Sequence, residues 1–469
     1  MGRGEKRQTS AGGESRQAPD ASPIGTLARQ FDVLPRHGLQ RLLALEEPDA
    51  PLLVDEGEGA PTWYVQDAWR IFSPKTTGDG IGGRTVARFR VDAGGEAILS
   101  HDPFSGRLYA PFDLAAAYDA YVSETAAAAT GRRSLSARQL NTFYRIKPLI
   151  PRRLQLGTRR LFVRWQGLPR FPAWPLDQSV VRLLHLYAFC VLFAQGKSAA
   201  PFRWFWPERH RAALALTHDV EGDEGLRLAL ELADLEEDLG FRSSFNLGGW
   251  YRVDPGLLRE LTGRGFEIGV HGLRHDRSLF SSRAAFEAQQ PALRELMQRL
   301  GAVGFRSPST HRVLQWVGEL PVEYDCSMPH SDPFEPQPGG CCSLWPFFIG
   351  GGVVELPYTL PQDHTLFTLL GHRTPDVWLE QAVRIEQEHG LIQCLTHPDP
   401  GYLGNARNRA MYAEFLRAMA DRPQVWRALP REIAAWWRRR DLGEGEMEHG
   451  VVRVGKAPEE VTLEPPGSA

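Results

Sequence analysis

The stretch 212–221, AALALTHDVE, places an apolar run directly before a cluster of polar residues. The run Ala212–Leu216 is apolar at every position, which is typical of a strand buried on both faces of a parallel sheet. If the chain stays extended beyond it, Asp219 and Glu221 point the same way and can bracket one site. Capping of a following helix by the same two acids is the alternative.

Four more apolar runs follow in the second half of the chain: Ser243–Leu247, Glu267–Val270, Val303–Phe305 and Leu391–Leu395. Amphipathic stretches separate the runs, and one predicted helical stripe consists of Leu228, Leu232, Leu235 and Leu239. Strand and helix in alternation imply right-handed crossovers and a parallel sheet, either open or closed into a barrel. A barrel places its chemistry at the carboxyl ends of its strands.

Polar residues also follow three of these later runs. His271 and His275 are spaced i, i+4, which places two imidazoles on one face of a helical turn and suits a divalent ion. Arg306 suits a carboxylate partner because its guanidinium is planar, and His397 can exchange a proton near neutral pH. Taken singly, each is also compatible with a structural role.

In this order the residues resemble the polysaccharide deacetylase family (carbohydrate esterase family four, also called the chitooligosaccharide deacetylase homology domain) over about residues 205–440. The matching motifs are Thr217-His218-Asp219-Val220-Glu221, His271 with His275, Arg306 with Pro308, and Leu395 with His397. The resemblance implies an α/β fold with a distorted (β/α) barrel. It also implies a metal-dependent deacetylase.

The resemblance assigns a role to each candidate residue. Asp219 is the base, His397 is the general acid, and Arg306 pairs with Asp219 and keeps it ionised. The metal ligands are Glu221, His271 and His275, with Zn²⁺ as the first choice and Co²⁺ or Ni²⁺ as alternatives. Three protein ligands leave a position open for water, as a catalytic site requires.

Two positions depart from the family pattern, and two others are candidates for the proton-transfer machinery. Glu221 stands where the family usually has Asp, and Ser309 replaces an aromatic residue that follows the Arg-x-Pro motif. By the same resemblance Asp325 orients the general acid, although it is equally compatible with a turn. Asp325 and His330 are next in line for the acid itself.

The implied reaction removes the acetyl group of an N-acetylated saccharide or glycan precursor and releases acetate and a free amine. Hydrolysis of a non-sugar C–N bond on the same fold is one alternative, because fold and metal do not set the substrate. A non-catalytic glycan-binding protein with a vestigial site is another.

The sequence predicts four regions. Residues 1–23 are a disordered tail, 24–204 an N-terminal α+β region of unknown role, 205–440 the barrel, and 441–469 a C-terminal extension. Within 24–204 the pattern predicts a helix at Leu39–Leu45, strands at Trp63–Phe72 and Thr85–Val91, helix from Leu114 to Ala129, and a buried helix at Leu183–Ala194.

The charge balance and the cysteine content of the sequence limit the classes of binding partner and cellular compartment that we expect. Among 469 residues, 54 basic and 57 acidic side chains give a formal net charge of −3, which provides no global attraction to nucleic acid or anionic lipid. Five cysteines form no disulfide framework or metal motif, and the first residues lack the apolar core of a secretory signal. We therefore expect a cytoplasmic protein with no nucleic-acid partner and no membrane span. The expected carbohydrate substrate is what the family resemblance implies. The oligomeric state is not legible in the sequence.

Overall fold

The computed structural model describes residues 38–45, 57–67, 69–76, 83–130, 157–161, 163 and 167–467. All of them belong to one unit, Arg36–Ala469. The predicted tail, residues 1–23, lies outside the described residues.

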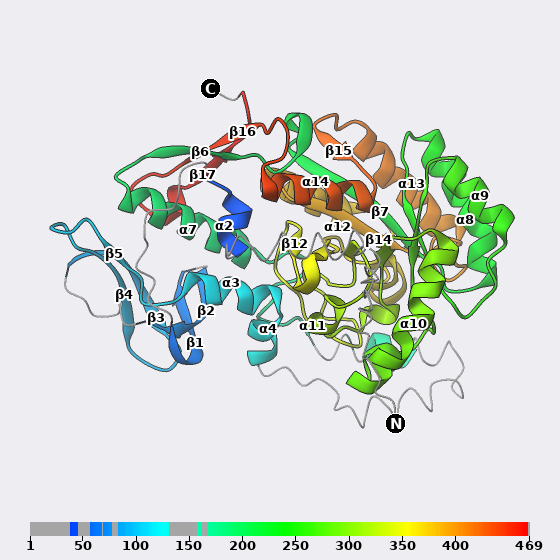
Figure 1. Ribbon diagram of the computed structural model, residues 1–469, viewed down its shortest axis with the longest axis horizontal. Helices are drawn as coiled ribbons and strands as arrows, with labels where there is room; N and C mark the ends of the chain where they lie inside the picture. The colour runs from blue at the N-terminus through cyan, green and yellow to red at the C-terminus, as the bar shows by residue number, and fades with distance from the viewer. Residues whose placement is uncertain are drawn as a thin grey trace, which may run out of the picture. The chain divides into compact units, whose positions relative to one another are not determined.

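The second half of the chain forms a curled nine-stranded sheet (Figure 1). Its strands are β7 (Ala212–Asp219), β8 (Ser244–Leu247), β9 (Glu267–Val270), β10 (Gly304–Phe305), β11 (Tyr324–Asp325), β12 (Phe347–Phe348), β13 (Val354–Glu355), β14 (Leu391–Thr396) and β15 (Val425–Arg427). The order is β12-β13-β11-β10-β9-β8-β7-β14, and β15 also pairs with β7. Every pair is parallel except β12 with β13.

Backbone hydrogen bonds bring the two ends of this sheet together. The N–H groups of Thr359 and Leu360, which follow β13, donate to the carbonyl of Gln393 in β14 at 3.2 and 3.1 Å. Because β14 pairs with β7 along its length, the sheet curls round on itself. The predicted α/β fold with a distorted (β/α) barrel is therefore confirmed.

Helices alternate with the barrel strands: α8 (Asp223–Asp238), α9 (Pro255–Gly263), α10 (Arg283–Leu300), α11 (Leu314–Val317), α12 (Asp376–Gln387), α13 (Ala406–Ala420) and α14 (Pro430–Leu442). A short π-helix, His364–Leu370, precedes α12.

The buried face of α8 is rotated by part of a turn from the row of leucines that the sequence predicted. Of its four leucines only Leu232 is fully buried; the buried face comprises Gly225, Leu226, Ala229, Leu232, Ala233 and Glu236. Glu236 turns inward because its carboxylate accepts hydrogen bonds from His218 Nε2 at 2.7 Å and Ser243 Oγ at 2.6 Å. The acidic side chain of Glu236 therefore lies on the buried face of α8, where helical periodicity predicts apolar side chains.

The N-terminal region contains an antiparallel sheet in the order β2-β1-β3-β4-β5. The strands of this sheet are β1 (Glu58–Gln66), β2 (Trp69–Lys75), β3 (Arg84–Val91), β4 (Glu96–His101) and β5 (Leu108–Tyr109). The helices of the N-terminal region are α2 (Gly38–Leu43), α3 (Leu114–Val122), α4 (Thr125–Ala129) and α7 (Ser179–Ala194).

Two predicted elements of this region are each divided in two. The run Trp63–Phe72 is not one strand but the two arms of a hairpin, which turns at Asp67 with a φ of 47°. The helical stretch from Leu114 to Ala129 is interrupted at Glu124, whose φ of 63° is incompatible with a continuing right-handed helix. The buried helix predicted at Leu183–Ala194 is confirmed within α7.

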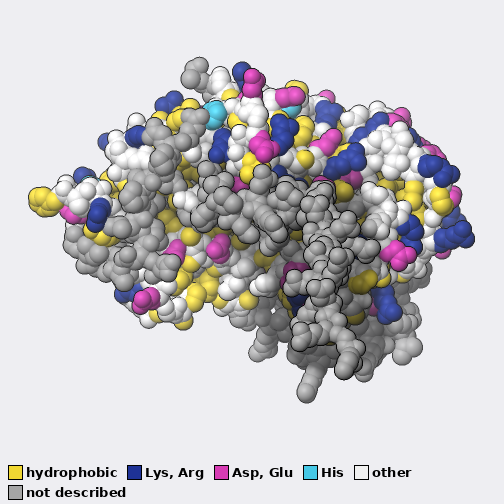
Figure 2. Space-filling model, in the orientation of Figure 1, with side chains coloured by type: hydrophobic (Ala, Val, Ile, Leu, Met, Phe, Trp, Pro, Cys, Tyr) yellow, Lys and Arg dark blue, Asp and Glu magenta, His cyan; other side chains and the backbone are white. Residues whose placement is uncertain are grey.

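A third sheet, in the order β17-β16-β6, joins β6 (Ala199–Arg203) to β16 (His449–Arg453) and β17 (Thr462–Glu464). The last part of the chain thus pairs with the end of the N-terminal region, and the domain boundaries themselves stay a prediction. Among the described helices, none has the length and apolar character needed to cross a bilayer. Basic and acidic side chains are interspersed over the described surface in Figure 2, in keeping with the small net charge.

Candidate functional site

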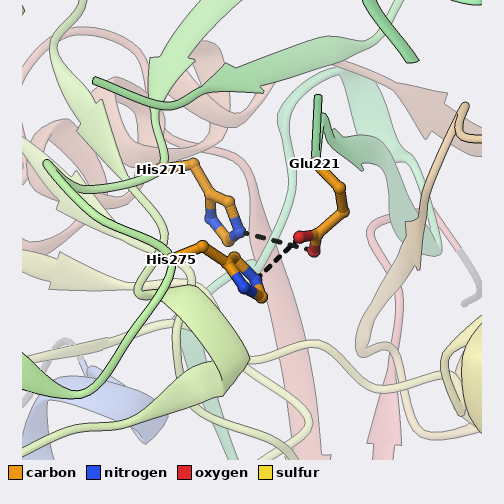
Figure 3. Close-up of side chains that lie close together, drawn as sticks. All are labelled: Glu221, His271 and His275. Atoms are coloured by element: carbon orange, nitrogen blue, oxygen red, sulfur yellow. Dashed lines mark ion pairs between the residues drawn. The ribbon is translucent and has the colours of Figure 1, made fainter. Parts of the chain in front are cut away.

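Three predicted metal ligands converge where β7 and β9 end (Figure 3). One ligand atom each from Glu221, His271 and His275 lies within 4.8 Å of the others. His275 Nε2 is 2.8 Å from Glu221 Oε2, and His271 Nε2 is 3.9 Å from Glu221 Oε1. A carboxylate and two imidazoles at this spacing are a donor set suited to a divalent ion such as Zn²⁺.

The hydrogen bonding of His271 fits that use. Its Nδ1–H donates to the backbone carbonyl of Arg306 at 3.0 Å, so in a neutral ring the lone pair is on Nε2. The ring is 1% exposed, and within the described residues Nε2 has no hydrogen-bond partner. A buried nitrogen without a partner, aimed at a carboxylate, is what a metal ligand requires.

The two histidines meet by a different route from the one predicted. The backbone from His271 is irregular, with a bend over residues 273–277, and does not form a helical turn. Gly272 allows the bend because its φ is +85°, and a Cβ there would meet Pro308 at 3.0 Å. The i, i+4 spacing identified the pair correctly, but the geometry comes from a glycine turn packed against the Arg-x-Pro loop.

The charges of the site hold Glu221 ionised. Burial alone would raise the pKa of Glu221, but the hydrogen bond and charge of His275, together with the charge of His271, lower it to about 2. Its backbone N–H donates to Asp399 Oδ2 at 2.9 Å, which anchors the segment leaving β7.

Asp219 is the last residue of β7 and lies beside the cluster. Its Oδ2 is 3.8 Å from His271 Nδ1 and 3.7 Å from Arg306 Nη1, and its Oδ1 accepts from Asn246 Nδ2 at 2.8 Å. Burial alone would raise the pKa of Asp219, but His271, Arg306 and the Asn246 hydrogen bond hold it below its ordinary value. The predicted pairing of Arg306 with Asp219 is present.

Arg306 is fully buried, and a second contact fixes it. Its Nη2 donates to Thr217 Oγ1 at 3.1 Å, which orients the guanidinium along β7 toward Asp219. The guanidinium therefore lies beside the carboxylate, with Nη1 at ion-pair distance from Oδ2.

His397 follows β14 on the other side of the cluster. Its Nε2 is 3.8 Å from Glu221 Oε1, and its Nδ1 is 2.8 Å from Asp363 Oδ1. The backbone N–H of His397 also donates to Asp363 Oδ2 at 3.0 Å. Burial would lower the pKa of His397, but the charge and hydrogen bond of Asp363 raise it to about 10, so the ring is protonated at neutral pH.

The prediction that Asp325 orients the acid is wrong. Asp325 accepts from Ser327 N and Oγ at 3.1 and 2.7 Å. Its strand, β11, lies between β10 and β13, so the side chain is near Arg306 and Glu355 and not near the end of β14. The carboxylate that contacts His397 is that of Asp363.

His330 is also removed from the chemistry. Its Nε2 accepts from the backbone N–H of Asp177 at 2.8 Å, and its Nδ1–H donates to Ser343 O at 3.0 Å. The ring is fully buried, and burial lowers its pKa. A neutral ring with both nitrogens occupied is a structural histidine.

Sequence reasoning missed four residues around the site: Asn246, Asp363, Trp250 and Tyr402. Asn246 is a polar residue near the end of a predicted strand, so the rule that found Asp219 would have found it too. Trp250 lies with its ring centroid 5.3 Å from that of His275, and Tyr402 stacks on His397 at 4.5 Å. These two half-buried rings supply aromatic surface beside the site.

No family model and no curated protein matches the chain. Among solved structures, it is similar to a protein described as a polysaccharide deacetylase from Mycobacterium smegmatis, with 19% identity over 50% of this chain and 93% of that one and a TM-score of 0.42. It is also similar to an allantoinase, with 17% identity over 50% of this chain and 93% of that one and a TM-score of 0.39. A third match is a protein described as a polysaccharide deacetylase from Pseudomonas aeruginosa PAO1, with 17% identity over 50% of this chain and 94% of that one and a TM-score of 0.39. The chain is therefore similar to solved structures described as polysaccharide deacetylases.

Proposed function

We propose that the protein is a metal-dependent hydrolase that removes acetyl groups from an N-acetylated saccharide or glycan precursor. The observation that carries the proposal is the placement of a base and an acid on two sides of one ligand cluster. Asp219 lies 3.8 Å from His271, and His397 lies 3.8 Å from Glu221. Hydrolysis of an amide needs both groups, one to activate water and one to protonate the amine.

Glu221, His271 and His275 would hold the ion, and their number leaves a position open for substrate or water. Zn²⁺ suits the two imidazoles and one carboxylate best, and Co²⁺ or Ni²⁺ can take the same ligands. When bound, such an ion lowers the pKa of water and polarises a carbonyl oxygen.

The protein side chains divide the proton transfers between them. Asp219 accepts the proton of the attacking water, held ionised by Arg306 and Asn246. His397 donates a proton to the departing nitrogen, held in orientation by Asp363. The C–N bond breaks, the acyl carbon gains the water oxygen, and the products are acetate and a free amine.

Two aromatic rings support a saccharide as the substrate. Ser309 removes the stacking surface that the family usually provides after its Arg-x-Pro motif. Trp250 and Tyr402 offer rings at the cluster and at the acid, respectively, on which the C–H face of a sugar can pack. The Trp250 indole is fixed because its Nε1–H donates to Glu221 O at 3.1 Å.

Acetate release tests the proposal directly. N-acetylated and O-acetylated saccharides, a non-sugar acetamide and a cyclic amide are each incubated with the protein and Zn²⁺, Co²⁺ or Ni²⁺. Ring opening replaces acetate as the measured product for the cyclic amide. We expect acetate from an N-acetylated saccharide, loss of turnover in Asp219→Asn, and unchanged turnover in Asp223→Asn, an exposed acid at the start of α8. Turnover confined to the non-sugar amides would reassign the substrate, and metal binding without any turnover would contradict an enzyme.

A further inference from the structure

A cavity of about 460 Å³ lies between β2, the segment 170–182 and the last turn of α12. Its walls carry four arginines, Arg70, Arg170, Arg182 and Arg384. None of the candidate metal ligands or proton-transfer residues lines it. The cavity therefore needs an explanation of its own.

The cavity and the candidate active site lie toward different ends of the barrel. Gln387 and Glu388 line the cavity, and β14 begins three residues after Glu388, at Leu391. His397 follows the other end of β14, about 20 Å along an extended strand of six residues. A ligand in the cavity is thus separate from the proposed chemistry.

Two acids line the cavity, but neither neutralises all four arginines. Asp177 is occupied by the backbone, because its Oδ1 accepts from Ser179 N at 2.8 Å and its Oδ2 accepts from Ala173 N at 2.7 Å. Burial raises the pKa of Glu388, and the charge of Arg182 opposes that rise. Of the four arginines, Arg182 is the one whose charge acts on Glu388.

The other three arginines are exposed residues. Within the described part of the chain, no carboxylate forms an ion pair with Arg70, Arg170 or Arg384. They come from three segments that are far apart in the sequence, so the fold itself brings three unmatched positive charges to one cavity. Such an arrangement attracts an anion.

We propose that this cavity binds a phosphate dianion, either free phosphate or the phosphate group of a small organic monoester. The planar forks of several guanidiniums match the oxygens of phosphate. The volume is in the range of small-ligand pockets. Phe171 and Leu176, which also line the cavity, would contact the carbon skeleton of an organic monoester.

Calorimetric titration of the full-length protein with inorganic phosphate tests the proposal. We expect saturable binding at one site, and at least about tenfold weaker binding in the double variant Arg70→Ala with Arg384→Ala. The matched control is Arg88→Ala with Arg453→Ala. This control also removes two positive charges, but from exposed arginines that form ion pairs with Glu96 and Glu464. It should bind phosphate as the unchanged protein does.

A third variant separates this site from the proposed metal centre. His275→Ala removes a half-exposed ligand of that centre and should leave phosphate binding intact. Glucose 6-phosphate distinguishes the two sources, since tighter binding than phosphate supports an organic monoester and equal affinity supports free phosphate. Absence of saturation, equal loss in the control pair, or loss in folded His275→Ala would overturn the site, whatever the outcome of the acetate assays.

Discussion

Arg312 and Glu124, 188 residues apart in the sequence, form a two-point ion pair in which Arg312 is buried and Glu124 is partly buried. The guanidinium donates through Nε to Glu124 Oε2 at 2.8 Å and through Nη2 to Oε1. Its Nη1 donates to Thr310 O at 2.7 Å, four residues after Arg306. The N-terminal region therefore helps hold the loop that carries Arg306, the partner of the proposed base.

The first prediction tests this contact with Glu124→Ala. The variant leaves a guanidinium that is 2% exposed without its carboxylate, and loss of one partner of a buried pair costs about 3–5 kcal/mol. We expect the free energy of unfolding in urea to fall by that order and turnover to fall with it. Glu96→Ala, which breaks the exposed pair with Arg88, should change the free energy by less than about 1 kcal/mol. Similar small losses in both variants would show that the pair contributes little.

The second prediction concerns the metal. His271→Ala removes a buried nitrogen that has no other partner among the described residues, so stoichiometric binding of Zn²⁺ should be lost. Elemental analysis after dialysis measures the content. His372→Ala, outside the cluster, is the control and should keep one ion per chain. A full metal content in His271→Ala would remove His271 from the ligand set.

The third prediction separates the base from the carboxylate ligand. Asp219→Asn should keep the metal and lower kcat by about 10²–10⁴, because the amide cannot accept the proton. Glu221→Gln should instead lower the metal content, since Glu221 is the only carboxylate of the cluster. Metal loss in Asp219→Asn together with turnover in Glu221→Gln would mean that the roles are exchanged.

The barrel and most of the site could be predicted because the signals are local. Each apolar run is followed within a few residues by the polar group it positions, as for Asp219 after β7 and His397 after β14. Parallel strands then bring these groups to one end of the sheet whatever the connections between them. The roles proposed for these groups come from the family resemblance.

The contacts that could not be predicted depend on long-range packing. Asp363 reaches His397 from 34 residues away, out of a loop that no strand pattern marks. Glu236 reads as a surface position of α8 until His218 and Ser243 are packed against it. Glu124 lies where the helical stretch is interrupted, and the interruption depends on the left-handed backbone conformation of this one residue. None of these partners is encoded by periodicity or by spacing.

The fourth prediction concerns stability and pH. Glu267, the first residue of β9, is buried, and burial raises its pKa from 4.5 to about 7. The folded protein therefore binds this proton more tightly than the unfolded chain does. The stabilisation is complete below pH 4.5 and is lost as the pH rises through about 7.

We expect Glu267→Gln to remove that dependence. Between pH 5 and pH 8 the unchanged protein should lose roughly 2–3 kcal/mol relative to the variant, measured as the free energy of unfolding in urea. Glu260→Gln, at a half-exposed acid of α9, should show the same pH dependence as the unchanged protein. A constant difference between Glu267→Gln and the unchanged protein would show that Glu267 is ionised throughout.

The last prediction concerns His397 and Asp363. His397→Ala should lower kcat on an amide by about 10²–10⁴ and leave metal content nearly unchanged, because the general acid is not a ligand. An activated acetate ester should be affected much less, since its leaving group needs no proton. Asp363→Asn should show the same contrast in smaller measure, because the ring stays present but loses the charge that orients it. Equal losses on amide and ester in both variants would mean that the pair supports the fold and that another group protonates the amine.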